Sequence, residues 1–469
     1  MFHKIYQRLS EKLKIFGMRR ALNRLNSNPD KNIPKMLRWV EKYDKGGVVK
    51  GQIKVLNNII GDNTNNWYKL IKSLWTDIDN DVRRRVFENL VINATIIGGP
   101  RQDKLKKENN CNIPWAILMD PTSACNLNCV GCWSSEYGKS LSMSYETLDD
   151  IISQGKNLGV YMYLFSGGEP LVRKKDIISL CEKHSDCLFM AFTNATLIDE
   201  KFADDMLRVQ NFIPAISIEG FKDETDARRG AGTYDATINA MELLKRKKLL
   251  FGISCCYTRK NTDVIGSEKY FDDMINKGAK FAWFFTYIPV GADAVPDLMV
   301  TAQQRQFMYH QIRNFRETKS IFTLDFWNDG EYINGCIAGG RLYLHINANG
   351  DMEPCAFIHY SDSSVYEKTL LEALKSPLFI QYHNNQPFNS NHLRPCPLLD
   401  NPNRLVDMVE KSGAKSTDIK NPEDVRELSS KCQEASEKWA VASELLLYER
   451  GGCSSCKSCS YCAGKYSSL

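Results

Sequence analysis

The stretch CNLNCVGC at residues 125–132 says most about how this chain folds. It directly follows an apolar run at residues 115–119, which is typical of a buried strand. Three thiols this close together can bind one cuboidal iron–sulfur cluster and leave one iron without a protein ligand. They can also bind zinc if a fourth ligand comes from elsewhere in the chain. The spacing alone therefore leaves both kinds of metal centre open.

Around this loop, between residues 113 and 291, short apolar runs alternate with helical patterns. The six candidate strands are residues 115–119, 161–165, 188–192, 215–218, 251–257 and 281–287. The helices predicted between them are residues 145–157, 175–184, 199–208, 234–246 and 267–277. This alternation predicts a parallel sheet, either open or curled into a partial barrel.

Polar motifs stand where these strands end. SGGEP at residues 166–170 follows the second strand, Thr193-Asn194 follows the third, and SIEG at residues 217–220 ends the fourth. Because parallel strands end at the same edge of a sheet, these motifs and the cysteine loop are expected at one site. Glycines in such a turn let the backbone approach a ligand closely.

These motifs, in this order, resemble those of the radical SAM superfamily, whose members bind S-adenosylmethionine (SAM). The resemblance implies an α/β fold: a partial (β/α)6 TIM-like barrel with a helical N-terminal region and a Cys-rich C-terminal extension. It implies that Cys125, Cys129 and Cys132 hold a [4Fe–4S] cluster whose open iron binds SAM. The residues that it implies for SAM binding are Gly167, Gly168, Glu169, Asn194, Ser217, Glu219 and Arg228. Whether Arg228 or Arg229 lies near the SAM carboxylate stays open.

The resemblance also implies the chemistry. One electron from the cluster would cleave SAM to methionine and a 5′-deoxyadenosyl radical, which abstracts hydrogen from a substrate. An electron donor such as ferredoxin or flavodoxin is implied as a partner. The alternative is a structural zinc loop on an unrelated α/β domain.

The C-terminal cysteines resemble, more loosely, the SPASM or Twitch extension of this superfamily. Cys336, Gly350 and Cys355 match the start of its pattern, and Asn349-Gly350 predicts a hairpin turn with positive φ at both residues. The resemblance implies one or two auxiliary [4Fe–4S] clusters. Cys336, Cys355 and Cys396 would share one, completed by a tail cysteine or an outside ligand. The tail cysteines are Cys453, Cys456, Cys459 and Cys462. They depart from the SPASM spacing, so they could hold a second cluster, a zinc ion or a rubredoxin-like iron.

The chain divides into residues 1–107, which are helical, residues 113–300, the barrel, and residues 301–469, the auxiliary region. The polar segment 101–112 suits a linker. A final helix is predicted from Asn421, with Pro422 at its first position, to Gly451-Gly452. On it, Cys432 is expected to pack in the core. Cys255 and Cys256 are expected on opposite faces of the fifth strand, and Asp325, Asp329 and Glu331 in a solvated loop.

Composition narrows the class of protein. The 469 residues include 16 cysteines but no secretory signal, so metal or redox chemistry in the cytoplasm is favoured over disulfides. A net charge of +5 does not indicate a nucleic-acid partner. No apolar run is long enough to span a membrane. The basic amphipathic N-terminus could contact a membrane surface, although such a helix more often packs on its own domain.

Three functions remain open from the sequence. The first is a radical SAM enzyme that modifies a peptide or protein. The second is the same chemistry on a lipid or small metabolite. The third, from another class, is a non-catalytic zinc protein that binds partners.

Overall fold

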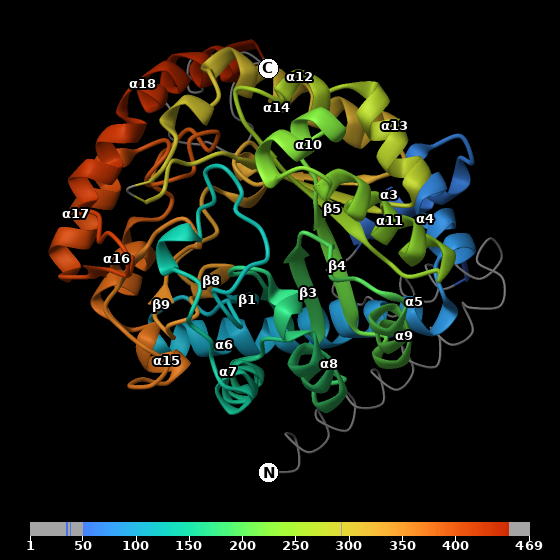
Figure 1. Cartoon of the computed structure of the whole chain (residues 1–469), viewed down its shortest axis with the longest axis horizontal. Helices are drawn as coiled ribbons and strands as arrows, with labels where there is room; N and C mark the ends of the chain where they lie inside the picture. The colour runs from blue at the N-terminus through green and yellow to red at the C-terminus, as the bar shows by residue number, and fades with distance from the viewer. Residues whose placement is uncertain (1–33, 36–37, 39–49, 292, 450–469) are drawn as a thin grey trace.

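A nine-stranded, mostly parallel sheet lies at the centre of the computed structural model, which describes residues 34–35, 38, 50–291 and 293–449. The strands lie in the order β7-β6-β5-β4-β3-β2-β1-β8-β9. The six expected strands are β1 (Ala116–Met119), β2 (Met162–Phe165), β3 (Leu188–Thr193), β4 (Phe212–Ser217), β5 (Gly252–Tyr257) and β6 (Phe281–Thr286). Figure 1 shows them curled into a partial barrel with helices outside, which confirms the predicted fold class.

Two strands from the C-terminal region extend this sheet at its two edges. β7 (Phe322–Asp325) pairs in parallel with β6, and β8 (Tyr343–Ile346) pairs in parallel with β1. β8 then forms the predicted hairpin with β9 (Met352–Glu353). Of its turn residues Asn349 and Gly350, Gly350 alone has positive φ, at 86°, so the turn is not the expected one. The barrel and the C-terminal region share one hydrophobic core.

The helices that follow the strands cover the outside of the barrel. They are α7 (Tyr145–Leu158), α8 (Lys174–Lys183), α9 (Glu200–Val209), α10 (Lys222–Arg229), α11 (Thr233–Arg246), α12 (Thr262–Ile265), α13 (Glu268–Lys277) and α14 (Ala302–Thr318). Several begin at a side chain that caps the first turn. Ser144 accepts a hydrogen bond from Thr147 N, and Asp199 accepts one from Phe202 N. All five helices expected within the barrel are present, with ends within a residue or so of the predicted ones.

N-terminal helices close the end of the barrel where the strands begin. They are α3 (Lys50–Gly61), α4 (Asn66–Asp77), α5 (Asn80–Phe87), η1 (Glu88–Gly98) and α6 (Gly99–Asn109). Asn89 donates to Cys187 O, just before β3, and Gln102 donates to Gly159 O, just before β2. The linker expected at residues 101–112 is therefore wrong: α6 occupies most of it, and its buried Gln102 binds the loop before β2.

The C-terminal region wraps around one side of the barrel (Figure 1). Its remaining elements are β10 (Tyr360–Ser361), α15 (Leu370–Ala373), α16 (Pro377–Asn385), α17 (Pro402–Ser412), β11 (Lys415–Ser416) and α18 (Val425–Glu449). The predicted start of the last helix is wrong, because α18 begins at Val425 rather than near Pro422. Cys432 on α18 is fully buried in the core, as predicted.

Some expectations lie outside the described residues, among them the N-terminal amphipathic segment and the tail Cys453, Cys456, Cys459 and Cys462. Within the part of the chain that is described, no helix is both long and apolar enough to cross a membrane.

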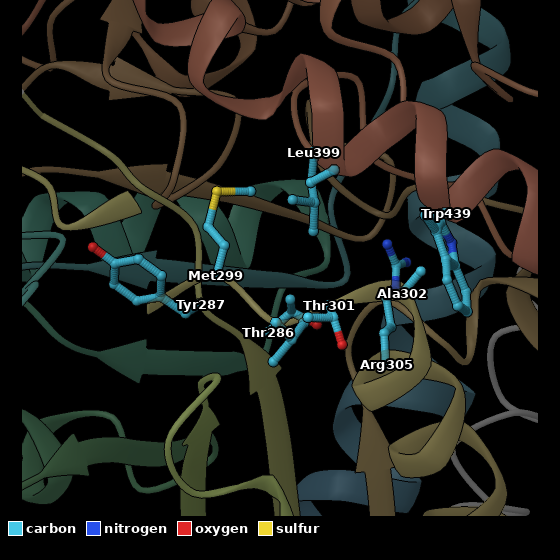
Figure 2. A pocket seen from close by; sticks show the side chains of 10 residues that line it. Thr286, Tyr287, Met299, Thr301, Ala302, Arg305, Leu399 and Trp439 are labelled. Atoms are coloured by element: carbon cyan, nitrogen blue, oxygen red, sulfur yellow. The ribbon is translucent and has the colours of Figure 1, made fainter. Parts of the chain in front are cut away.

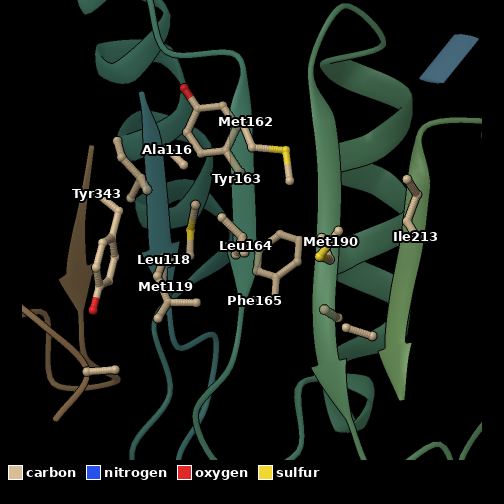
Figure 3. Packing of buried hydrophobic residues seen from close by; sticks show 14 of the residues in the cluster. Ala116, Leu118, Met119, Met162, Tyr163, Leu164, Phe165, Met190, Ile213 and Tyr343 are labelled. Atoms are coloured by element: carbon tan, nitrogen blue, oxygen red, sulfur yellow. The ribbon is translucent and has the colours of Figure 1, made fainter. Parts of the chain in front are cut away.

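The strand register defines the inner face of the barrel. Leu118 pairs with Leu164, and Met190 lies between Leu164 and Ile213, so these four side chains point the same way (Figure 3). By the same pairing the inner face comprises Ala116, Leu118, Met162, Leu164, Met190, Phe192, Ile213, Ala215, Ser217, Ser254, Cys256, Trp283, Phe285, Leu324, Tyr343 and His345. Apart from His345, this face consists of apolar, aromatic or small polar side chains.

Candidate active site

The cysteine loop lies at the edge where the strands end, held by hydrogen bonds from three directions. Val130 N donates to Arg228 O (2.9 Å) at the end of α10. Lys139 Nζ donates to Cys125 O (3.3 Å) and Leu127 O (3.2 Å). Asn194 Nδ2 donates to Asn126 Oδ1 (2.9 Å), which ties the loop to the end of β3. The loop backbone is thus attached to other parts of the predicted site.

The three thiols influence one another electrostatically. The pKa of Cys125 is raised to about 11, mainly by burial and to a smaller extent by nearby Glu169, Cys129 and Cys132. Burial also raises the pKa of Cys129, which Arg229 and Arg228 oppose. Neutral thiols must lose protons to bind metal, and the two arginines favour the resulting thiolates.

This donor set fits an iron–sulfur cluster. The donors are three thiols on one short loop. In a cuboidal cluster each thiolate binds a different iron, so its ligands do not have to meet at one point.

The Gly-Gly-Glu-Pro turn packs directly against the backbone that leads into the cysteine loop. Gly168 N donates to Thr122 O (3.0 Å), and Glu169 N donates to Ala124 O (2.8 Å). A Cβ atom on Gly168 would lie 2.2 Å from Ala124 O, and Gly167 has φ +96°. The glycines are therefore needed for this contact between two backbone segments. A role for them in approaching SAM stays a prediction.

Glu169 is buried and fully engaged within the protein. Its carboxylate accepts hydrogen bonds from Thr193 Oγ1 (2.6 Å), Asn194 N (2.8 Å) and Leu171 N (3.0 Å). Burial raises its pKa, and these hydrogen bonds act in the opposite direction. The carboxylate joins the ends of β2 and β3, so its contact with the SAM amino group also stays a prediction.

Glu219, at the end of β4, pairs with both arginines of α10. Its Oε1 lies 2.8 Å from Arg228 Nη1 and accepts a hydrogen bond from Arg229 Nε (2.8 Å). Burial alone raises the pKa of Glu219, but the two arginines outweigh it and lower the pKa below its usual value. Both arginines thus stay close to the cysteine loop, and Ser217 lies nearby on the inner face.

The adjacent cysteines of β5 separate as expected. Cys255 is fully buried on the outer face, 3.2 Å from Tyr270 Oη of α13. Cys256 is partly exposed on the inner face, and its backbone N–H donates to Glu219 (3.2 Å). Cys256 therefore lies among the predicted SAM-binding residues.

A buried charge network beside the cysteine loop was missed from the sequence. His345 Nδ1 lies 2.6 Å from Glu353 Oε2, and His345 Nε2 lies 3.1 Å from Asp120 Oδ2, with all three side chains fully buried. Tyr137 Oη donates to Glu353 (2.9 Å), and the Trp133 ring packs edge-on against the His345 ring. The sequence signal that could have indicated this network is His345 itself, a histidine at an inward position of an otherwise apolar strand.

A cavity brings together the three cysteines expected to hold the auxiliary cluster. Cys336, Cys355 and Cys396 line a space of about 450 Å³, bounded otherwise mainly by aromatic and aliphatic side chains. Burial raises the pKa of all three, to about 12 for Cys355 and about 11 for Cys396. Tyr343 Oη donates to Cys355 Sγ (2.8 Å). This donor set also fits an iron–sulfur cluster.

The segment before Cys336 is not the solvated loop expected there. Asp325 is fully buried at the end of β7 and accepts a hydrogen bond from Asn328 Nδ2 (2.8 Å). Asp329 is also buried, and Arg316 donates to it (2.6 Å). Glu331 pairs with Arg313 (2.6 Å). The expectation was wrong because the partly buried Arg313 and Arg316 and the buried Asn328 pair with these carboxylates.

A second cavity, of about 290 Å³, lies between the end of β6, α14 and α18 (Figure 2). Arg305 borders it, and its guanidinium lies over the Trp439 ring at 4.1 Å. Arg305 Nη1 also donates to Asp400 Oδ1 (2.6 Å). This arrangement links α14, α18 and the loop that contains Cys396.

Comparison with known proteins identifies the barrel. The family model of the radical SAM superfamily matches residues 119–263, which include the cysteine loop and every polar motif described above. Residues 119–263 form a radical SAM domain.

The relatives of this domain carry names that refer to different activities. The chain is 27% identical over 268 residues to the mycofactocin maturase MftC of Mycolicibacterium smegmatis, covering 53% of this chain and 66% of that protein. It is 25% identical over 240 residues to the Fe-coproporphyrin III synthase of Methanosarcina barkeri, covering 46% and 57%. The chain thus spans less than two thirds of the length of these relatives.

A solved structure has a similar fold. Streptococcus suis SuiB bound to its precursor peptide SuiA superposes with a TM-score of 0.53 at 19% identity, covering 71% of this chain and 79% of SuiB. The likeness in fold therefore extends beyond the radical SAM domain.

Proposed function

We propose that this chain is a radical SAM enzyme that cleaves SAM reductively and abstracts hydrogen from a peptide or protein. The observation that carries this proposal is the attachment of the cysteine loop to its surroundings. Gly168 and Glu169 bind its leading backbone, Asn194 binds Asn126, and Arg228 binds Val130. Segments that a SAM site requires are thereby joined at one edge of the sheet.

Each part of this edge has a proposed task. Cys125, Cys129 and Cys132 would hold a [4Fe–4S] cluster, which when bound supplies the electron that cleaves SAM to a 5′-deoxyadenosyl radical. Arg228 and Arg229 offset the negative charge of the thiolates and, with Glu219 and Ser217, would bind SAM. Glu169 and Asn194 would hold its methionine end. The apolar inner face would exclude water from the reactive centre.

Two of the similar proteins support a peptide as the substrate. One relative is a maturase, and SuiB was solved with a precursor peptide. The inner face near the site presents the partly exposed aromatic residues Phe192, Trp283 and Phe285. Such a wall suits an aromatic or aliphatic side chain of a peptide.

A lipid or small metabolite is the second candidate. The same inner face carries no charge apart from His345, which suits any apolar substrate. The likeness to an Fe-coproporphyrin III synthase adds a relative named for a small molecule. Testing a peptide and a small apolar substrate in parallel separates the two candidates.

The auxiliary region and the partners complete the proposal. Cys336, Cys355 and Cys396 would hold one auxiliary [4Fe–4S] cluster with a tail cysteine or an outside ligand, and the other tail cysteines a second one. A ferredoxin or flavodoxin in a low-oxygen cytoplasm would supply electrons. Peripheral membrane contact through the N-terminus is also proposed.

The deciding experiment is anaerobic reconstitution with iron and sulfide, followed by SAM and dithionite. We expect 5′-deoxyadenosine from the native chain and none from Cys125→Ala, which should also lose about four irons per chain. Cys181→Ala, at a buried cysteine outside the site, is the matched control. It should retain both the bound iron and the formation of 5′-deoxyadenosine. A native chain that binds zinc and forms no 5′-deoxyadenosine would instead support the zinc-protein alternative.

A further inference from the structure

The phenol of Tyr382 is buried without a hydrogen-bond partner. Tyr382 lies on α16 and has no exposed surface. Within the described part of the chain, no group hydrogen-bonds to its hydroxyl oxygen. An unsatisfied buried hydroxyl is destabilising, so native proteins nearly always provide a partner.

Tyr382 lines a cavity together with Cys336, Cys355 and Cys396, and all three thiols interact electrostatically with its phenol. The other lining residues are mostly apolar, among them Phe326, Phe357 and Ile358. Tyr343, the other tyrosine of the wall, already donates to Cys355 Sγ. A group that occupies the cavity is thus the available acceptor for Tyr382.

We propose that Tyr382 belongs to the auxiliary centre and donates a hydrogen bond to a sulfur of its iron–sulfur cluster. This inference rests on the auxiliary cluster proposed above. A phenol keeps its proton at neutral pH and is therefore a donor. Cluster sulfurs accept hydrogen bonds, and such bonds tune the reduction potential.

The hydrogen bond has a predictable effect on the cluster. Reduction adds negative charge to the cluster, so a donor at its sulfur stabilises the reduced form more than the oxidised form. Tyr382 therefore raises the reduction potential of the auxiliary cluster. Loss of the hydroxyl lowers that potential without removing a ligand.

The test uses the full-length chain with Cys125, Cys129 and Cys132 all changed to Ala, so that the SAM cluster is absent. Tyr382→Phe is introduced into this background, and both chains are reconstituted anaerobically. The auxiliary cluster of each is then titrated with a reductant and followed by EPR. We expect unchanged iron and sulfide content and a midpoint potential shifted to more negative values. A Cys336→Ala chain in the same background identifies the signal, which should disappear.

A second readout comes from folding. In the metal-free chain Tyr382→Phe should melt at the same or a higher temperature, because an unsatisfied hydroxyl is removed while the ring still packs edge-on against Phe388. The matched control is Tyr163→Phe, whose hydroxyl bonds Ile152 O (2.8 Å) on the outer face of the sheet. Tyr163→Phe should lower the melting temperature and leave the potential unchanged.

Three results overturn the inference. An unchanged potential in Tyr382→Phe excludes the hydrogen bond. Loss of the auxiliary iron in a folded Tyr382→Phe chain assigns the residue a different role, as ligand or support. Absence of any cluster in the Tyr382-containing chain contradicts the proposed auxiliary centre itself, and with it this inference.

Discussion

His345 is flanked by two buried carboxylates. Burial alone lowers the pKa of an imidazole, but Asp120 and Glu353 outweigh it and raise the pKa of His345 to about 10. The resulting imidazolium joins the end of β1, which leads into the cysteine loop, to the β8–β9 hairpin of the auxiliary region. One residue thus links the two proposed cluster sites electrostatically.

This linkage predicts a pH dependence of stability. The folded pKa lies above the unfolded value of about 6.5, so the stabilisation is complete below about pH 6.5 and is lost as the pH rises toward 10. Urea unfolding of the metal-free chain should show a loss on the order of 1 kcal/mol per pH unit in this window. His345→Gln should flatten that slope.

The exposed His310 supplies the control, because His310→Gln should keep the native slope. If His345→Gln and the native chain lose stability in parallel between pH 7 and 10, the buried imidazolium is not the cause.

At the scale of elements, the segments that follow β1 and β2 are joined by backbone hydrogen bonds. The Gly-Gly-Glu-Pro turn after β2 donates two backbone hydrogen bonds to the segment after β1. Side chains would hold these backbones apart, so the sequence needs glycine at Gly168 for a steric reason. The cysteine loop is therefore positioned by its neighbouring strand as well as by its own sequence.

Gly168→Ala should disturb the cluster site without removing any ligand. A Cβ atom 2.2 Å from Ala124 O forces the two backbones apart, at a cost of about 1–3 kcal/mol or more. The expected result is a lower melting temperature and less iron bound per chain, measured by calorimetry and iron analysis. Gly99→Ala, at the start of α6 with open space around it, should leave both values unchanged or slightly raise stability. Normal iron content in Gly168→Ala would show that the contact is dispensable.

At the scale of the whole molecule, α18 holds the wall of the auxiliary cavity. Trp439 Nε1 donates to Leu393 O (2.8 Å), and Ser436 Oγ donates to Asp400 O (2.7 Å). Between these contacts runs the loop with Cys396. The indole also packs on Arg305 (Figure 2), and Arg305 pairs with Asp400. The geometry of Cys396 therefore depends on a helix distant in sequence from the barrel.

Trp439→Ala should impair the proposed auxiliary cluster but not the proposed SAM cluster. Removal of a buried indole costs about 3–5 kcal/mol and loosens the Cys396 loop. Reconstituted protein should lose auxiliary iron yet still form 5′-deoxyadenosine from SAM. Leu445→Ala, on the same helix but 57% exposed, is the matched control. It should change neither the auxiliary iron content nor the formation of 5′-deoxyadenosine. Equal loss of both functions in Trp439→Ala would mean that the two regions fold as one unit.

The residues of the radical SAM domain could be found from the sequence because their signals are local. Apolar periodicity predicted all six barrel strands and the helices between them. The cysteine spacing and the polar motifs at strand ends lie within short segments, so their grouping at one edge follows from parallel pairing alone. The linker at residues 101–112 was predicted wrongly because a polar composition is shared by linkers and by surface helices.

Tertiary structure alone decided what distant segments do to one another. The pairing of β8 with β1, the burial of His345 between Asp120 and Glu353, and the placement of Tyr382 beside three cysteines each join residues far apart in the chain. Local sequence reports which side of an element is apolar, but it does not report which element will cover that side. Partners of buried polar groups are chosen only when the core closes, because burial makes an unpaired polar group costly.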